Sequence, residues 1–340
     1  SITLSNSTYT VESGDCYDAR GTYDATNDTI IFWFNDTSQR LRLATGYLGG
    51  TTASNASFNF VQGLEYIDNV ATNFPACLID PDTGLFVGFW SEPNTPAAKA
   101  VCASIGSNRQ LSFSTTVTTI ASAYHYFTEC DYDTVNNKVV VGYRESNYGR
   151  ARVGTVSTSP TNSITFGTEV TYESASTGYN HLIYDPTGKR VIAFYQDGGN
   201  NDYATYAEGV VSGTSITFGT PATAYSSAAT YYHDAIYAPN AGRMVFSFQV
   251  TQTPASYVFR ATADVTNLTA ENYIGISNGA YSDGATATIQ TVGSIDDAQS
   301  SLTAGQQYYV QGDGSLGLTP ASPSVFAGTA VSATKLIIKG

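Results

Sequence analysis

A set of charged side chains occupies matching places in the sequence and could carry out acid–base chemistry if the fold brought them together. The set is Arg20, Glu129, Asp131, His181 and Asp234, with Asp18 and His233 close by in the sequence. Carboxylates beside an imidazole and a guanidinium can transfer protons, bind a sugar or bind a cation. These residues are far apart in the chain, so the elements that position them decide whether they form a site.

A strand-like segment recurs along the chain at a nearly constant interval. Residues 164–168 and 216–220 both read ITFGT, 52 positions apart (216 − 164). LSFST at 111–115 and ASFNF at 56–60 precede them at intervals of 53 (164 − 111) and 55 (111 − 56). A repeat of this length indicates one supersecondary unit that stacks on its neighbours.

A second segment recurs in phase with the first: an apolar strand, a turn residue, a short turn and another apolar strand. Its turn residues are Asp24, Asp80, Asp133, Asp185 and Ala238. An Asp at this place can accept hydrogen bonds from the amides of its own turn, and Pro or Gly then fits the backbone angles of the hairpin. Because the Asp recurs in nearly every copy, we interpret these residues as structural turn residues and not as catalytic carboxylates.

Each copy predicts four strands, so the whole chain predicts an all-β fold. Four short strands cannot bury both of their faces alone, and radial stacking of five such units gives a five-bladed β-propeller over residues 1–267. Only the first four copies are followed by an outer strand, so residues 1–10 are expected to complete the last blade. Residues 268–340 lack the repeat and predict a small β-rich domain for docking or assembly.

Strand alternation places the charged set on the channel side of the innermost strands, since its members lie two or four positions before the turn residue of their copy. The set is therefore a candidate ligand site at one mouth of the channel. A water-filled channel lined by polar side chains explains the same arrangement of charged residues without a ligand. If the protein is an enzyme, the candidates for catalysis are Glu129, Asp18, Asp131 and Asp234, because glycoside hydrolysis needs two carboxyl groups.

Five-bladed glycosidases of the arabinanase and fructosidase type carry an acidic residue on the innermost strand of each of their first three blades. This sequence is similar to them in the first and third copies, which offer Asp18 and Glu129, but it has Pro75-Ala76 in the second. The departure favours a protein without enzyme activity.

Composition and charge exclude some partners. The net charge is −13, the 15 basic residues are scattered over 340 positions, and no long apolar run is present. Nucleic acids and anionic membranes attract clustered Lys and Arg, so neither is an expected partner. No segment is apolar for long enough to span a membrane.

The four cysteines, Cys16, Cys77, Cys102 and Cys130, have no spacing typical of a metal site. We therefore predict no metal and no cofactor. Free, buried thiols are the favoured interpretation, and their disulfide state stays open.

Two parts of the chain resemble a known group of proteins. Units such as YDPTGKRVIAFYQDGGNNDYATYAEGVVSGTSITFGT resemble repeats in virion structural and tail-fibre-like proteins of marine tailed phages. The segment from AENYIGIS to SATKLIIKG resembles a C-terminal module that recurs in such proteins. The resemblance covers about residues 75–250 and nearly all of the C-terminal part, whereas the first copy departs from it.

The resemblance implies a structural or adhesive protein on a particle surface: a fibre, an appendage or a capsid-decorating subunit. It implies other virion proteins as partners, a homo-oligomer in an assembly, and host surface glycans as ligands. Two alternatives stay open, namely a propeller-type glycoside hydrolase and a secreted or cell-surface carbohydrate-binding protein similar to a lectin.

Overall fold

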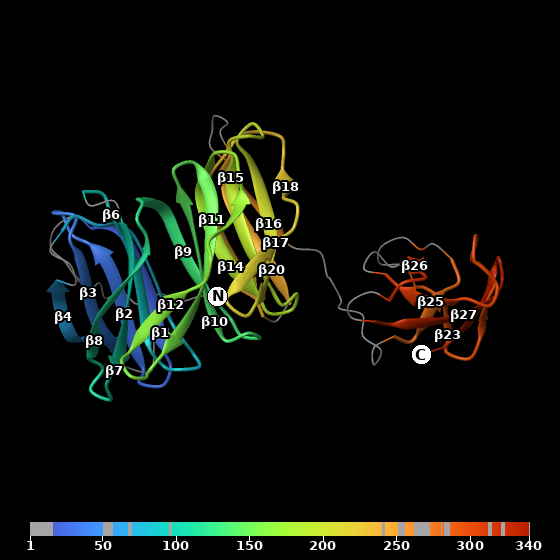
Figure 1. Cartoon of the computed structure of the whole chain (residues 1–340), viewed down its shortest axis with the longest axis horizontal. Coiled ribbons are helices and arrows are strands. Elements are labelled where there is room, and N and C mark those ends of the chain that lie inside the picture. The colour runs from blue at the N-terminus through green and yellow to red at the C-terminus, as the bar shows by residue number, and fades with distance from the viewer. Residues whose placement is uncertain are drawn as a thin grey trace. The chain divides into compact units, whose positions relative to one another are not determined.

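The computed structural model describes residues 16–49, 57–66, 70–94, 97–239, 242–250, 256–261, 273–279, 281, 286–311, 315–320 and 324–339. Within these ranges the chain forms β-strands, and it has no helix that could cross a membrane. It divides into two compact units, Ser1–Asp264 and Val265–Gly340 (Figure 1). The predicted all-β fold is confirmed.

The first unit contains antiparallel sheets of consecutive strands (Figure 1). The first sheet consists of β1 (Tyr17–Asp24), β2 (Thr29–Asn35), β3 (Leu41–Gly49) and β4 (Ser57–Tyr66). The second consists of β5 (Asn73–Ile79), β6 (Phe86–Glu92), β7 (Ala97–Ile105) and β8 (Leu111–Ala121). The third consists of β9 (His125–Asp133), β10 (Lys138–Glu145), β11 (Tyr148–Ser157), β12 (Ser163–Phe166) and β13 (Val170–Glu173).

The next two sheets continue the series. The fourth consists of β14 (Thr177–Asp185), β15 (Arg190–Asp197), β16 (Tyr203–Ser212), β17 (Ser215–Phe218) and β18 (Ala222–Tyr225). The fifth consists of β19 (Thr230–Ala238), β20 (Arg243–Val250) and β21 (Ser256–Ala261). The outer edges of the third and fourth sheets are divided, since β12 and β13 both pair with β11, and β17 and β18 both pair with β16. Residues 1–10, predicted to complete the fifth blade, lie outside the described ranges.

Carboxylates cap the turn between the first two strands of four sheets. Each accepts a hydrogen bond from the backbone N–H two residues later, at 2.8–3.0 Å; the acceptors are Asp24, Asp80, Asp133 and Asp185. All four are buried, so their oxygens have turn amides in place of water. This geometry explains why the residue type recurs without any need for chemistry.

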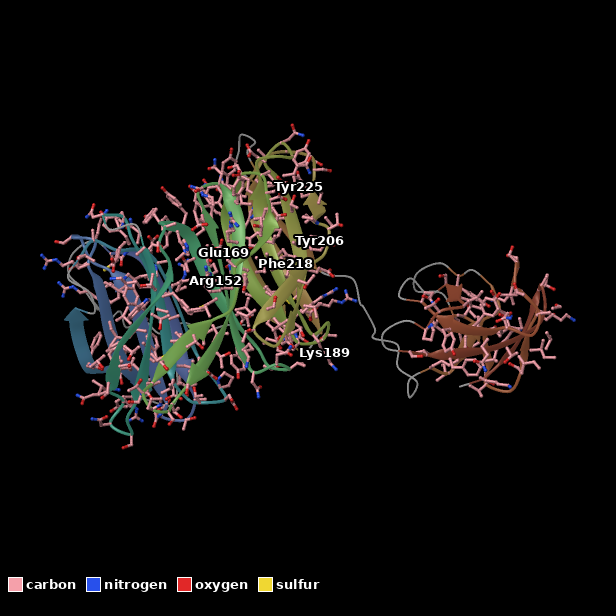
Figure 2. All side chains as sticks on the ribbon, viewed as in Figure 1. Arg152, Glu169, Lys189, Tyr206, Phe218 and Tyr225 are labelled. Carbon is pink, nitrogen blue, oxygen red and sulfur yellow. The ribbon has the colours of Figure 1, made fainter. Side chains whose placement is uncertain are left out.

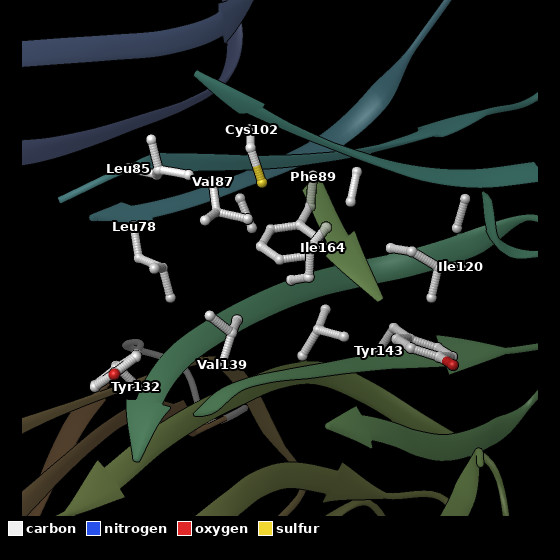
Figure 3. Close-up of a cluster of buried hydrophobic side chains, with 14 residues drawn as sticks. Leu78, Leu85, Val87, Phe89, Cys102, Ile120, Tyr132, Val139, Tyr143 and Ile164 are labelled. Atoms are coloured by element: carbon white, nitrogen blue, oxygen red, sulfur yellow. The ribbon is translucent and has the colours of Figure 1, made fainter. Parts of the chain in front are cut away.

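In the second, third and fourth sheets the strand that follows the turn forms the middle of the core. Every residue of β6 is buried, and the apolar runs of β10 and β15 are buried as well, because neighbouring sheets cover both faces. Figure 3 shows the cluster between the second and third sheets, where Val87 and Phe89 face Val139 and Tyr143. Burial on two sides explains why these strands read as continuous apolar runs and do not alternate.

The cysteines differ in their surroundings. Cys77, Cys102 and Cys130 are free thiols, and burial raises the pKa of Cys77 and of Cys102 to about 12. Cys16 is exposed, so the prediction of a buried thiol is wrong at that position. Cys16 lies immediately before β1, the first strand of the first sheet, and β1 is mostly exposed.

The second unit has a small core of its own. A two-stranded sheet pairs β22 (Gly275–Ser277) with β23 (Ile289–Thr291). A five-stranded sheet has the order β24 (Ile295–Asp296), β28 (Lys335–Ile338), β27 (Phe326–Ser332), β25 (Gln307–Val310) and β26 (Leu316–Gly317). Leu302, Tyr308, Ala327, Ala330 and Leu336 form a buried cluster. Its modest size is typical of a domain with marginal stability.

Candidate functional site

A pocket of about 600 Å³ lies where the first strands of all five sheets of the first unit converge. Residues from β1, β5, β9, β14 and β19 line it, and β5 and β14 contact the first strands of the sheets on either side. The lining includes Arg20, Glu129, His181 and Asp234 of the predicted set, together with Asp18 and His233. The fold therefore brings four members of the predicted set to one place, on the side that strand alternation predicts.

The same irregularity shapes each of the five strands at the pocket. The pairing register of each strand with its neighbour shifts at one point, as at a β-bulge. One residue at each shift has a left-handed backbone, with φ between 49° and 51°; they are Asp18, Phe74, Phe127, Tyr179 and Tyr232. All five of these residues line the pocket.

Arg20 and Glu129 form an ion pair inside the pocket. The Arg20 Nη2 donates a hydrogen bond of 2.6 Å to Glu129 Oε1, joining β1 to β9 although 109 positions separate the residues. Burial opposes the charge of Arg20, but the adjacent Glu129 and Asp18 outweigh it and raise the pKa of the guanidinium. The pair is a charge-assisted hydrogen bond between Glu129 and a permanent cation.

His181 and Asp234 face each other on the neighbouring strands β14 and β19. The His181 Nδ1 lies 3.5 Å from Asp234 Oδ1, and the Asp234 side chain is 67% exposed. The backbone N–H of Ala235 donates to the same oxygen at 2.9 Å. A carboxylate at this ring nitrogen orients the imidazole.

Asp131 does not line the pocket, and this corrects its place in the predicted set. Its Oδ2 accepts a hydrogen bond of 2.7 Å from the N–H of Tyr184 on β14, and its Oδ1 accepts one of 2.8 Å from the N–H of Tyr132. Burial raises the pKa of Asp131, while these two amides and His181 oppose the rise. The side chain connects two sheets, because an amide of β14 lies within its reach.

Aromatic residues form a part of the pocket that the sequence-based set lacks. Phe74, Phe127, Tyr179 and Tyr232, which we call the aromatic rim, follow one another with ring centroids 5.5, 5.4 and 5.0 Å apart. Each lies six positions before the turn residue of its copy (74 to 80, 127 to 133, 179 to 185, 232 to 238). Extending the same alternation by two residues would have found them.

Among the described residues, no group of three or more His, Cys, Asp or Glu side chains could hold a metal ion.

Two buried histidines make the fold sensitive to acid. His125 stacks on Tyr143 at 3.6 Å, and His233 stacks on Phe194 at 4.6 Å. Burial lowers the pKa of each to about 3; Arg152 adds to the effect at His125 and His181 does so at His233. Arg152 is ion-paired with Glu169, and both residues are labelled in Figure 2. The Oε1 of Glu145 lies 3.9 Å from the Nε2 of His125.

We expect the free energy of unfolding to fall as the pH drops from 6.5 towards 3, because the unfolded chain binds protons in this range and the folded chain does not. At pH 5 the loss is about 2 kcal/mol for each histidine relative to pH 7.5. Denaturant titrations at both pH values measure it. His125→Phe keeps the stacking on Tyr143 and should remove about half of the loss; an unchanged pH dependence in this variant would contradict the assignment.

Comparisons with known proteins bear on the fold. No protein-family model matches the sequence, and no curated protein matches it. An exo-β-1,3-galactanase from Phanerochaete chrysosporium is similar at a TM-score of 0.47 and 9% identity, over 78% of this chain and 63% of the galactanase. An endo-arabinase from Bacteroides thetaiotaomicron is similar at a TM-score of 0.42 and 10% identity, over 78% of this chain and 98% of the arabinase. AofleA from Arthrobotrys oligospora is similar at a TM-score of 0.44 and 11% identity, over 76% of this chain and 75% of AofleA.

These neighbours correct the main functional interpretation of the sequence. The expectation of a structural particle-surface protein without enzyme activity is contradicted: the solved structures that this chain is similar to include a galactanase and an arabinase. The alternative of a propeller-type glycoside hydrolase fits them better. At 9–10% identity no residue role passes from those enzymes to this chain, so roles have to be argued from the pocket itself.

Proposed function

We propose that the first unit is a five-bladed β-propeller that binds a glycan in its pocket and hydrolyses a glycosidic bond there. The observation that carries the proposal is the pocket, which unites residues from the first strands of five successive sheets. It combines an ion-paired carboxylate, a histidine with a carboxylate partner, and a rim of aromatic rings. Ligands with both hydroxyl groups and apolar ring faces suit such a lining.

Glu129 is the catalytic carboxylate in this proposal. Hydrolysis needs one group that takes a proton from water or attacks the sugar, and that group has to be ionised. Glu129 lines the pocket and is ion-paired with Arg20. Asp131 is excluded because its oxygens are occupied by backbone amides away from the pocket lining.

The proton donor in this proposal is His181. Burial lowers the pKa of the other pocket histidine, His233, to about 3 and keeps it neutral. His181 lines the pocket with Asp234 at its Nδ1. Its proton passes to the glycosidic oxygen as the bond from that oxygen to C1 breaks. A water molecule then adds to C1 and gives its proton to Glu129, so that atoms and charge balance.

Incubation of the full chain with galactan, arabinan and xylan, followed by measurement of released reducing ends, tests the proposal. We expect product from at least one of these neutral polysaccharides. His181→Asn keeps the size and polarity of the side chain but cannot donate the proton, so we expect a loss of about 10²-fold or more. The proposal fails if no polysaccharide gives product, or if the variant releases product at the wild-type rate.

A further inference from the structure

The aromatic rim is built on backbone that its residues disfavour. Phe74, Phe127, Tyr179 and Tyr232 all have φ between 49° and 51°, the left-handed region in which a bulky side chain is rare. Glycine adopts this backbone without a steric penalty. None of the five bulge positions is glycine, so the need for a bulge alone does not explain the side chains that are present.

Packing does not explain the rim fully either. The Tyr232 residue is 66% exposed, and the other three members are half-buried. Their rings contact one another in series and lie on the pocket wall. A set of rings that contact one another and remain open to the pocket offers apolar faces to a ligand.

The charges of the pocket restrict that ligand further. The carboxylates of Asp18, Glu129 and Asp234 line it, against the single guanidinium of Arg20 and the imidazole of His181. The described lining is therefore anionic on balance when His181 is neutral. A sugar with a carboxylate or sulfate group would be repelled, and one with hydroxyl groups alone would find acceptors.

We propose that the aromatic rim is a preorganised stacking surface, and that with the acidic lining it selects neutral sugars over their anionic counterparts. The inference rests on the proposed function and names its substrate class. The bulges fix the direction of the rings before binding, which lowers the entropy cost of ordering them. Asp18 takes the fifth place of the series and supplies a hydrogen-bond acceptor in place of a ring.

A binding screen tests the selection for neutral sugars. Galacto- and xylo-oligosaccharides are compared with galacturonic acid oligomers and with sulfated forms of the same neutral chains. We expect the neutral members to bind and the anionic members to bind at least tenfold more weakly. Preference for the anionic members, or binding of no member, would overturn the inference.

Substitutions at Tyr232 test the rim itself, with the tightest neutral oligosaccharide as the probe. Tyr232→Ala and Tyr232→Gly should each weaken binding about tenfold, since one exposed ring face is lost. The glycine variant should melt at a higher temperature than the alanine variant, because only alanine keeps the backbone strain. Tyr23, 53% exposed on β1 and outside the pocket lining, is the matched control, and Tyr23→Ala should bind normally.

The outcomes separate this inference from the proposed function. Neutral sugars that bind at the rim without release of product would refute hydrolysis and leave the stacking surface in place. Release of product with unchanged binding by both Tyr232 variants would refute the stacking surface and leave hydrolysis in place.

Discussion

Glu129→Gln is expected to lower kcat/KM for glycan hydrolysis by about 10²–10⁴-fold, the contribution of a well-placed general base. Glutamine has nearly the shape of glutamate, and its carbonyl oxygen can still accept the hydrogen bond from Arg20. It cannot take a proton from water. The loss should therefore appear in kcat, with a smaller change in KM.

A second ion pair provides the matched control for this variant. Arg190 donates to Glu208 at 2.6 Å, the same distance as in the Arg20–Glu129 pair, but on β15 and β16 and outside the pocket lining. Glu208→Gln should keep wild-type activity. If both variants lose activity equally, the effect reports on charge or stability and not on chemistry at the pocket.

Trp33→Ala is expected to lower the free energy of unfolding by about 3–5 kcal/mol. Trp33 is fully buried between the first and second sheets, near Phe86, Trp90 and Phe113. Its Nε1 donates to the carbonyl oxygen of Phe89 at 3.2 Å, and this acceptor would lose its partner. Guanidinium unfolding curves of the two proteins measure the difference, and a loss below about 1 kcal/mol would contradict this packing.

Gly88 supplies an independent check on the same contact. A Cβ atom at Gly88 would lie 2.8 Å from Trp33 Cζ2, so Gly88→Ala should destabilise the wild type. In a Trp33→Phe background the smaller ring leaves more room. Gly88→Ala should therefore lower the free energy of unfolding by less than it does in the wild type. Gly63 has no atom within 4 Å of its Cβ position, so Gly63→Ala is the control. An equal loss of unfolding free energy in both backgrounds would show that Trp33 does not contact Gly88.

The repeated unit was predictable because its signals are local. The recurring Asp of the turns acts through hydrogen bonds within two or three residues, so that its role is visible in the sequence. Apolar runs such as β6 and β10 reflect burial on both faces, which the sequence also records directly. The all-β fold and the convergence of Arg20, Glu129, His181 and Asp234 follow from these signals and from strand alternation.

Other features depend on contacts between sheets and were not predictable. Asp131 has the correct position for the pocket, but an amide of Tyr184, 53 positions later, holds it elsewhere. The partner of Glu129 is Arg20, 109 positions away, and only the packing of the strands brings them together. The aromatic rim was missed because Tyr and Phe on strands usually reflect ordinary sheet packing, and the alternation was followed only as far as four positions before the turn residue.

Hydrolysis at the pocket is tested most directly by measuring product release from one polysaccharide with three proteins: the wild type, Glu129→Gln and Asp131→Asn. Both carboxylates belong to β9, but only Glu129 lines the pocket. We predict a loss of about 10²-fold or more for Glu129→Gln and activity close to the wild type for folded Asp131→Asn. Activity that survives in Glu129→Gln but disappears in folded Asp131→Asn would contradict it.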